Sequence, residues 1–233
     1  MQIRVEGTLE IQKMFTELLG SGDNSADKAM TVTINETVRG VRNKLTAEIP
    51  LVFDRPTPAA KKSIRYETRS ISKNKMNASV YVTDYLGADK AIHTQIHGGK
   101  RELKTYEKRL LRNNMLPVGK MTRPGPNAPL DMYGNYKPGQ LVIMLSKLRA
   151  FNDAGYNANA TKQDQYHYWT TKHGAFRRKR FTSGYPETLL VYIRQSRSYK
   201  KRFDFYGVGQ KEADKLLVEK ARMALDYALK HYR

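Results

Sequence analysis

The chain has 233 residues and no cysteine. A chain of this length can bury a core without crosslinks, and the missing cysteine excludes disulfides, thiolate nucleophiles and cysteine-ligated zinc. Its 42 lysines and arginines against 22 acidic residues give a formal net charge of +20, which favours phosphate-bearing or acidic partners. The apolar runs are too short for a signal peptide or a membrane span, so we expect a protein made and kept in a cytoplasm.

The charge is unevenly distributed along the chain. Residues 1–54 contain 6 basic and 8 acidic side chains, residues 55–150 contain 19 and 6, and residues 151–233 contain 17 and 8. The N-terminal quarter is therefore close to neutral, and we expect the cationic surface to begin at Arg55.

Two amphipathic helices are predicted near the N-terminus. Over residues 8–19 the apolar positions recur at helical spacing, with Thr8 placed to cap the helix and a Gly-Ser-Gly sequence to end it. Over residues 26–49 they follow at steps of 3 and 4, which predicts a long helix with one buried stripe. Pro50 follows, and Pro56 and Pro58 are then expected to force an extended, turn-rich passage at which the helix stops. Gly40 is expected on another face, at a cost of roughly 1 kcal/mol.

The middle of the chain predicts two strands and then an insertion. Residues 64–69 and 78–83 alternate apolar and polar side chains, as in an antiparallel pair with one solvated face. A short helix around Tyr106 and a helix over 140–151 flank a loop at 117–139 that is rich in Gly, Pro and Asn. We expect a helix-loop-helix insertion with this loop as an arm.

The last third is predicted to extend the same sheet. Residues 166–169, 189–193 and 203–206 have strand patterns, and residues 211–232 a helical one. The predicted fold class is α+β, with N-terminal amphipathic helices packed on an antiparallel sheet, a helix-loop-helix insertion and a C-terminal helix. We assign residues 1–84 and 161–233 to the core domain and 85–160 to the insertion.

One histidine pair and one glycine turn have patterns that deserve comparison with known motifs. His93 and His97 are four residues apart, as in helical metal sites, but the glutamate of H-E-x-x-H and a third ligand are missing. The turn at 97–101 could approach a phosphate through its backbone N–H groups, yet it lacks P-loop and Rossmann spacing. Polar residues before a simple turn are the preferred interpretation.

A metal-dependent nuclease is the enzymatic alternative. Asp131 with Glu102 or Glu107 would supply two carboxylates near a cationic loop. These residues form no compact D-x-D or E-x-K pattern, and the sequence has no G-x-S-x-G nucleophile motif. Salt bridges to neighbouring cations are the preferred interpretation, so we predict no enzyme, no catalytic residue, no metal and no cofactor.

Two basic stretches, 172–180 and 194–202, are more informative than the acids. Each places about five cations beside Phe or Tyr, which suits phosphate neutralisation with some stacking. Solvated strand ends or an acidic neighbouring subunit would explain them equally well. No helix-turn-helix, RNP or zinc-finger pattern is present, so any DNA contact is expected at the backbone. The predicted DNA- or partner-facing basic surface comprises Lys172, Arg177, Arg178, Lys179, Arg180, Arg194, Arg197, Lys200, Lys201 and Arg202.

Five short sequence motifs occur in an order that is informative when they are taken together. They are IPLVFDRPT at 49–57, ASVYVTD at 78–84, GGKR at 98–101 with Lys104, Glu107 and Leu110 after it, LDMYGN at 130–135 and IMLS at 143–146. In this order they resemble tailed-bacteriophage tail-completion proteins of the minor tail protein Z type, and the similarity extends from the N-terminal helices to the final helix.

This resemblance implies a virion protein at the head–tail junction, assembled in the host cytoplasm. Its subunits would form a homo-oligomeric ring, a hexamer or a dodecamer, that contacts other phage neck, portal or tail proteins and touches packaged DNA nonspecifically, with no membrane. The loop at 117–139 would be an inter-subunit arm, with contacts predicted at Pro124, Pro126, Tyr133 and Tyr136. The alternative is a nonspecific basic nucleic-acid-binding protein used in phage DNA packaging or replication.

Overall fold

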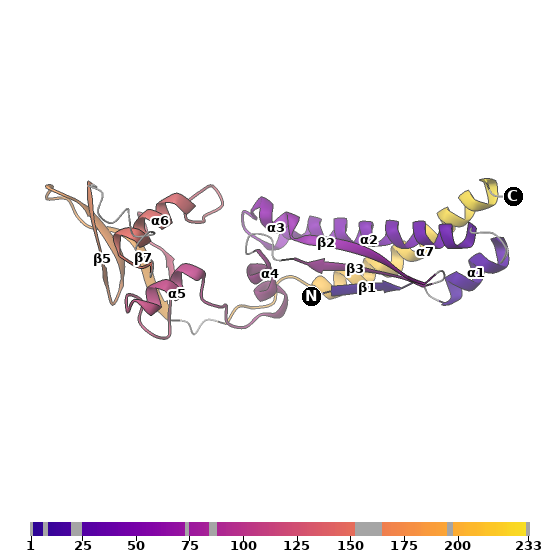
Figure 1. Ribbon diagram of the computed structural model, residues 1–233, viewed down its shortest axis with the longest axis horizontal. Coiled ribbons are helices and arrows are strands. Elements are labelled where there is room, and N and C mark those ends of the chain that lie inside the picture. Colours follow the sequence, from indigo (N-terminus) through magenta and orange to yellow (C-terminus); the bar gives the residue numbers. More distant parts are fainter. Residues whose placement is uncertain are drawn as a thin grey trace. The chain divides into compact units, whose positions relative to one another are not determined.

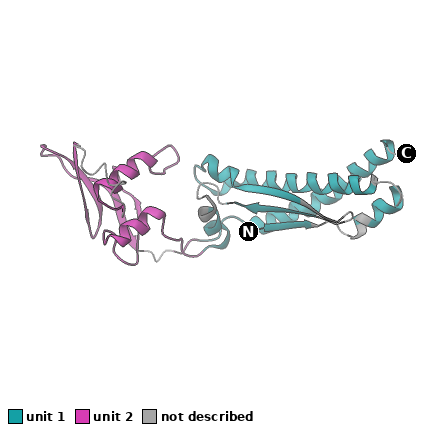
Figure 2. Ribbon diagram, in the orientation of Figure 1, with its two compact units in different colours: residues 1–98, 200–233 teal, residues 99–199 magenta. Residues whose placement is uncertain are grey.

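The computed structural model describes residues 2–6, 9–19, 25–72, 75–83, 88–151, 165–194 and 198–231. The chain divides into two compact units, residues 1–98 with 200–233 and residues 99–199 (Figure 2). Each unit has its own antiparallel sheet and its own hydrophobic core. The predicted α+β class, with long helices near both ends of the chain, is confirmed.

The first unit combines a three-stranded sheet with two long helices that lie side by side, α2 and α7 (Figure 1). The strand order is β1-β3-β2, and both pairings are antiparallel. The elements are β1 (Gln2–Glu6), α1 (Leu9–Leu19), α2 (Ser25–Val52), α3 (Pro58–Lys62), β2 (Ile64–Ser72), β3 (Lys75–Val82), α4 (Ala88–His97) and α7 (Phe205–His231).

The stripe predicted for α2 forms the centre of the first core. Ile34, Val38, Val41, Leu45 and Ile49 are at most 1% exposed and belong to the same cluster as the inward residues of the sheet and of α7. Full burial of such side chains contributes about 1.5–3 kcal/mol each. Apolar packing along α2 is therefore the main stabilising feature of this unit.

Gly40 has a packing role that the sequence pattern did not predict. It lies on α2 where Leu216 of α7 packs, and a Cβ at this position would come within 2.3 Å of Leu216 Cδ1. The glycine therefore allows this close contact between the two helices.

Helix α2 runs three residues past the predicted Ile49, to Val52, and ends before Pro56 and Pro58; the Phe53 N–H still donates to the Ile49 carbonyl at 2.9 Å. A proline in the last turn removes one backbone hydrogen bond, and its fixed φ is compatible with the helix. The chain then turns into α3, where Thr57 Oγ1 caps the helix by accepting from the Ala60 N–H at 3.2 Å.

Residues 203–206 do not form the predicted strand. Phe203 and Phe205 are both buried, but α7 begins at Phe205. The Asp204 carboxylate accepts a hydrogen bond from the Gly207 N–H at 3.0 Å, as a helix N-cap does. The apolar alternation that resembled a strand is the entry into a capped helix.

The second unit is a four-stranded antiparallel sheet with two short helices on one side of it (Figure 1). The strand order is β4-β7-β6-β5. Leu110, Leu145, Ala175 and Leu190 are at the centre of its core. The elements are α5 (Thr105–Arg112), β4 (Lys120–Pro124), α6 (Pro138–Lys147), β5 (Tyr166–Thr171), β6 (Gly174–Lys179) and β7 (Glu187–Arg194).

This sheet changes the predicted domain boundaries. The strands at 166–193 do not extend the first sheet but pair with one another and with β4, which lies inside the predicted loop at 117–139. The insertion therefore spans residues 99–199 instead of 85–160. Helix α4 belongs to the first unit, where Ile92 and Ile96 are buried in the core.

The two ends of the insertion are held together by backbone hydrogen bonds. The Gly99 N–H donates to the Tyr199 carbonyl at 3.0 Å, and the Tyr199 N–H donates to the Gly99 carbonyl at 2.8 Å. Gly98 and Gly99 have φ values of 71° and 88°, which favour glycine. The GG of the GGKR motif thus shapes the entry into the second unit.

Candidate functional site

The second sheet presents two faces of different character. Side chains alternate along each strand, so Tyr168 and Arg177 lie on one face and His167, Trp169 and Phe176 on the other. The first of these faces carries the hydrophobic core and α6. The second face is the candidate interface.

An aromatic row, formed by His167, Trp169 and Phe176, runs across the candidate interface. The ring centroids of His167 and Trp169 are 5.6 Å apart at 17°, and those of Trp169 and Phe176 are 5.9 Å apart at 21°. Strand pairing places Arg178 directly opposite His167. His167 and Arg178 are exposed, while Trp169 and Phe176 are half-buried.

Cations surround this sheet. Lys172 lies in the turn between β5 and β6, Lys179 and Arg180 lie at the far end of β6, and Arg194 ends β7; all four are exposed. Lys120 of β4 adds a cation at the turn, because its Nζ donates to the Lys172 carbonyl at 3.2 Å. Five of the ten predicted basic-surface residues are thus exposed cations of the second unit: Lys172, Arg178, Lys179, Arg180 and Arg194.

Arg177 is placed differently from its neighbours. Its Nε donates to Glu187 Oε2 at 2.6 Å, and its guanidinium carbon lies 4.4 Å from the centroid of the Tyr166 ring. Burial opposes the charge, but the hydrogen bond with Glu187 contributes to a net rise in the pKa of Arg177. The carboxylate compensates this guanidinium, so Arg177 stabilises the sheet and does not add to the exposed positive charge.

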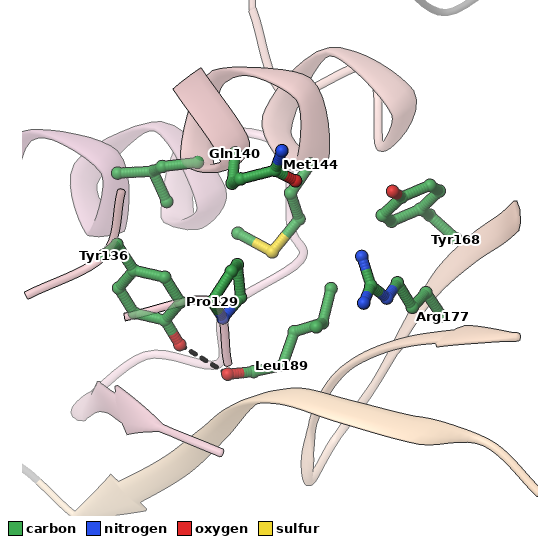
Figure 3. A pocket seen from close by; sticks show the side chains of 8 residues that line it. Pro129, Tyr136, Gln140, Met144, Tyr168, Arg177 and Leu189 are labelled. Atoms are coloured by element: carbon green, nitrogen blue, oxygen red, sulfur yellow. Dashed lines mark hydrogen bonds between the residues drawn. The ribbon is translucent and has the colours of Figure 1, made fainter. Parts of the chain in front are cut away.

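Arg177 also borders a small pocket on the helix-covered face (Figure 3). The Tyr136 hydroxyl donates to the Leu189 carbonyl at its floor, and Arg177 lies beside Tyr168. The lining contains no carboxylate and no histidine, so it offers neither a metal site nor a general base of the usual type. The pocket is lined by Pro129, Tyr136, Gln140, Leu141, Met144, Tyr168, Arg177 and Leu189.

The remaining predicted cations are not in the second unit's described part. Lys200, Lys201 and Arg202 belong to the first unit, just before α7, and are exposed. The Arg202 N–H donates to the Gln95 carbonyl of α4 at 2.9 Å. Arg197 lies outside the described residues. The predicted basic surface is therefore divided between two units.

The two units differ in net charge. Residues 99–199 contain 19 lysines and arginines against 6 acidic residues, a net charge of +13, whereas the rest of the chain contains 23 against 16, a net charge of +7. The single carboxylate on the four strands of the second sheet, Glu187, is paired with Arg177. Its exposed side chains therefore create a positive potential with little local compensation.

Glu107, a nuclease candidate, is a buried structural residue. Both of its carboxylate oxygens accept hydrogen bonds from the Arg101 guanidinium at 2.7 Å. The backbone N–H groups of Lys104 and Thr122 and the Thr122 hydroxyl also donate to it, at 2.6–2.8 Å. Burial would raise the pKa of Glu107, but these donors outweigh it and the pKa is lowered. A carboxylate with five donors has no capacity left for a metal ion.

Asp131, the second nuclease candidate, stabilises a turn. Its Oδ1 accepts from the Tyr133 and Asn135 N–H groups, both at 2.9 Å. Gly134 takes the left-handed conformation in the same turn, with φ of 79°. Across the described ranges, no group of three His, Asp or Glu residues is placed to hold a metal ion.

His93 and His97 do share a helix face, with ring centroids 4.4 Å apart. The pKa of His97 is lowered, first by burial and then by the positive charges of His93 and Lys201. A neighbouring cation disfavours metal binding as well as protonation. No third ligand joins the pair among the described residues. The pair also lies in a cationic environment, so the geometry does not favour a metal site.

The predicted arm residues are mostly built into the second unit. Pro124 pairs with Leu190 of β7, and Tyr136 is bonded to Leu189. The Gly125 and Asn127 N–H groups also donate to β7 carbonyls, at 2.7 and 3.1 Å. Pro126 is exposed and Tyr133 half-buried. The loop packs along β7, and an inter-subunit contact through these residues stays a prediction.

The aromatic row was missed in the sequence, although a signal for it exists. Only Lys172 and His173 separate β5 from β6, and a two-residue hairpin fixes the register. Counting from that turn brings Trp169 opposite Phe176 and His167 opposite Arg178. Phe181 and Tyr185, in the loop after β6, are also almost fully exposed, at 103% and 94%.

Comparisons of the chain with protein-family models, with curated proteins and with solved structures gave no match. In the described part of the chain, no helix has the length and apolar character needed to cross a membrane. Functional inference therefore rests on the residues and their geometry.

Proposed function

We propose that this chain is a structural protein of a tailed-phage particle that completes the tail and joins it to the head as a ring subunit of the neck. The observation that carries the proposal is the use of the motif residues that resemble the tail-completion group. Gly98 and Gly99 shape the entry into the second unit, Arg101 and Glu107 form its buried ion pair, and Asp131 stabilises a turn. Residues of these motifs build the fold and leave no described catalytic centre, which favours an architectural role.

Open sheet edges support assembly into a ring. Strands β1 and β2 are the two edges of the first sheet, and β5 is one edge of the second. The other edge, β4, is covered at its centre, because the Thr122 N–H donates to Glu107 and the Thr122 carbonyl accepts from Arg101 at 3.2 Å. Edge strands carry unpaired backbone groups that a neighbouring subunit can pair with, and closed rings reuse one such contact around an axis. The cationic second unit would suit an acidic neighbour or the phosphates of DNA in transit.

A genetic experiment tests the proposal. A stop codon early in the gene, in a phage or prophage that carries it, should yield filled heads and separate tails that do not join, with restoration by the wild-type chain supplied in trans. The matched control is the same mutant grown in a host strain that suppresses the stop codon, where joined particles should form. Normal yields of joined, infectious particles without the chain would overturn the proposal.

A second candidate is nonspecific nucleic-acid binding in packaging or replication, favoured by the net charge of +13 on residues 99–199. Binding through phosphates predicts that log Kd rises steeply with log salt concentration. Purified full-length chain that fails to bind duplex DNA at moderate salt would contradict this candidate.

A further inference from the structure

The exposed face of the second sheet combines two features that phosphate contact alone does not require. It carries the aromatic row (His167, Trp169 and Phe176), and Arg178 stands beside the exposed end of that row. A cationic surface for an acidic protein or for duplex DNA needs only charge. Half-exposed rings in one row are an additional, specific feature.

The geometry of the row leaves room for further planar groups. The centroid separations of 5.6 and 5.9 Å exceed the contact distance between carbon atoms, about 3.5–4.0 Å, although the planes are nearly parallel. A closely superposed pair would bring its centroids to about that distance, so neighbouring rings do not cover each other's faces completely. His167, at the end of the row, is exposed. A planar ring can stack against these free faces.

The charges around the row select the kind of planar ligand. Arg178 is opposite His167 on this face, Arg180 lies just after the end of the same strand, and Arg123 is an exposed cation of β4 on the same sheet. Alternation places Lys179, the partner of Tyr166, on the opposite face with Arg177. The single carboxylate on these strands, Glu187, is bonded to Arg177, which alternation places on the opposite face. A ligand that joins flat rings to regularly spaced negative charges matches this arrangement, and a nucleic-acid strand with unpaired bases is such a ligand.

We infer that this face of the second sheet binds single-stranded nucleic acid, with bases stacked on His167, Trp169 and Phe176 and phosphates neutralised by Arg178 and Arg180. The bases of a duplex are stacked on one another and their faces are not available, so this site should prefer a single strand. The inference goes beyond the neck role and is independent of it, because the site lies on one chain and needs no ring.

Trp169 makes the inference directly testable, because it is the only tryptophan of the chain. Its fluorescence in the full-length protein reports on the centre of the row without a label. The probes are an oligothymidylate of roughly 15 nucleotides, a duplex of the same length and the same strand with its bases removed. The expected result is quenching of Trp169 by the oligothymidylate alone, with affinity at least about 10-fold above that for the duplex or the abasic strand.

Matched variants separate stacking from charge. His167→Ala and Phe176→Leu should each weaken oligothymidylate binding by roughly 10-fold, whereas Tyr227→Ser, which removes a half-exposed aromatic ring from α7, should not. Arg178→Gln should weaken binding and reduce the slope of log Kd against log salt concentration by about one. Lys211→Gln, at an exposed position of α7, should leave the affinity and the slope unchanged. His167 is exposed, so His167→Ala tests the site without disturbing the core.

Two outcomes would overturn the inference. Equal affinity for all three probes with unchanged Trp169 fluorescence would show that binding is electrostatic and does not use the row. Failure to bind any of the three probes would overturn it as well, and would assign the face to a partner other than nucleic acid. Neither outcome touches the neck proposal, since the stop-codon phenotype is measured separately.

Discussion

The two units stabilise similar α+β layers by different means. In the first, α2 and α7 are 28 and 27 residues long and pack through a continuous apolar stripe and small residues such as Gly40. In the second, α5 and α6 have 8 and 10 residues, and a fully buried carboxylate, Glu107, joins a helix to the sheet. We therefore expect the first unit to respond mainly to changes in packing and the second mainly to changes in charge and pH.

The difference also concerns exposed surfaces. The second unit has nearly twice the net charge of the first and carries the aromatic row, so interactions with nucleic acid or an acidic partner are expected mainly there. The first unit carries the neutral N-terminal part and the longest helices. In the proposed ring, it is the more suitable framework for rigid contacts between subunits.

The largest effect is expected when the buried ion pair of the second unit is broken. Glu107→Ala leaves the largely buried Arg101 guanidinium without a partner and removes acceptors from two backbone N–H groups. The second unit should lose about 3–5 kcal/mol, while the first unit is unaffected. Urea unfolding measures the change, with the fluorescence of Trp169 reporting on the second unit and helical circular dichroism reporting on the long helices of the first.

The control for that variant is an exposed ion pair. Glu48→Gln breaks the contact with Lys44 on α2, at 2.9 Å between exposed or half-exposed side chains, and should cost less than about 1 kcal/mol. Equal losses for the two variants would contradict the structural role of Glu107.

Acid should act on the second unit in the same direction as Glu107→Ala. The folded-state pKa of Glu107 is below its ordinary value, so its contribution to stability is complete above the unfolded pKa and is lost as pH falls through the folded pKa. The unfolding midpoint of the second unit should fall between about pH 5 and pH 2, and the fall should be smaller in Glu107→Ala. A midpoint independent of pH over this range would show that the pair is not stabilising.

Alkali should weaken the same unit through its buried tyrosines. Burial raises the pKa of Tyr106 and Tyr192 to about 12 each. A raised folded-state pKa means that the stability is complete below the ordinary value near 10 and is lost as pH rises toward 12. Absorbance at the tyrosinate band, followed with unfolding, would detect these tyrosines as a late-titrating group.

A packing change should instead act on the first unit. Gly40→Val places a branched side chain where Leu216 of α7 packs and should cost about 1–3 kcal/mol. Gly139→Ala in α6 is the matched control, because a Cβ there meets nothing within 4 Å and the alanine favours the helix. Calorimetry should show a lower unfolding temperature for the first unit in Gly40→Val and an unchanged one in Gly139→Ala.

The smallest effect is expected for a single hydrogen bond. Tyr136→Phe removes the hydroxyl that donates to the Leu189 carbonyl between the loop and β7. A net loss of about 1 kcal/mol in the second unit is expected. No change in the urea midpoint would indicate that water replaces the hydroxyl without loss.

Much of the helical structure follows from sequence periodicity. The stripe from Ile34 to Ile49 predicted α2, and the alanines of the last helix predicted α7, because a long amphipathic pattern leaves few alternatives. The hairpin of β2 and β3 followed from alternation for the same reason. The helix extends past the predicted Ile49 because Pro50 lies in its last turn, where a proline removes only one backbone hydrogen bond.

The sheet to which each strand belongs could not be predicted from sequence periodicity. Alternation shows that residues 166–193 contain strands, but it says nothing about their partners, which are set by long-range packing. The candidate site, too, could be predicted from the sequence only in part. The cations of the basic surface are visible in the sequence, whereas the neutralisation of Arg177 by Glu187 and the row formed with Phe176 depend on strand register.

The measurement that tests the proposed role most directly is cryo-electron microscopy of intact particles that carry this gene. The account predicts density for this chain as a closed ring at the end of the tail nearest the head, with the two units recognisable by the long α2 and α7 helices and by the four-stranded sheet. Particles with a complete head–tail junction from which this chain is absent would contradict it.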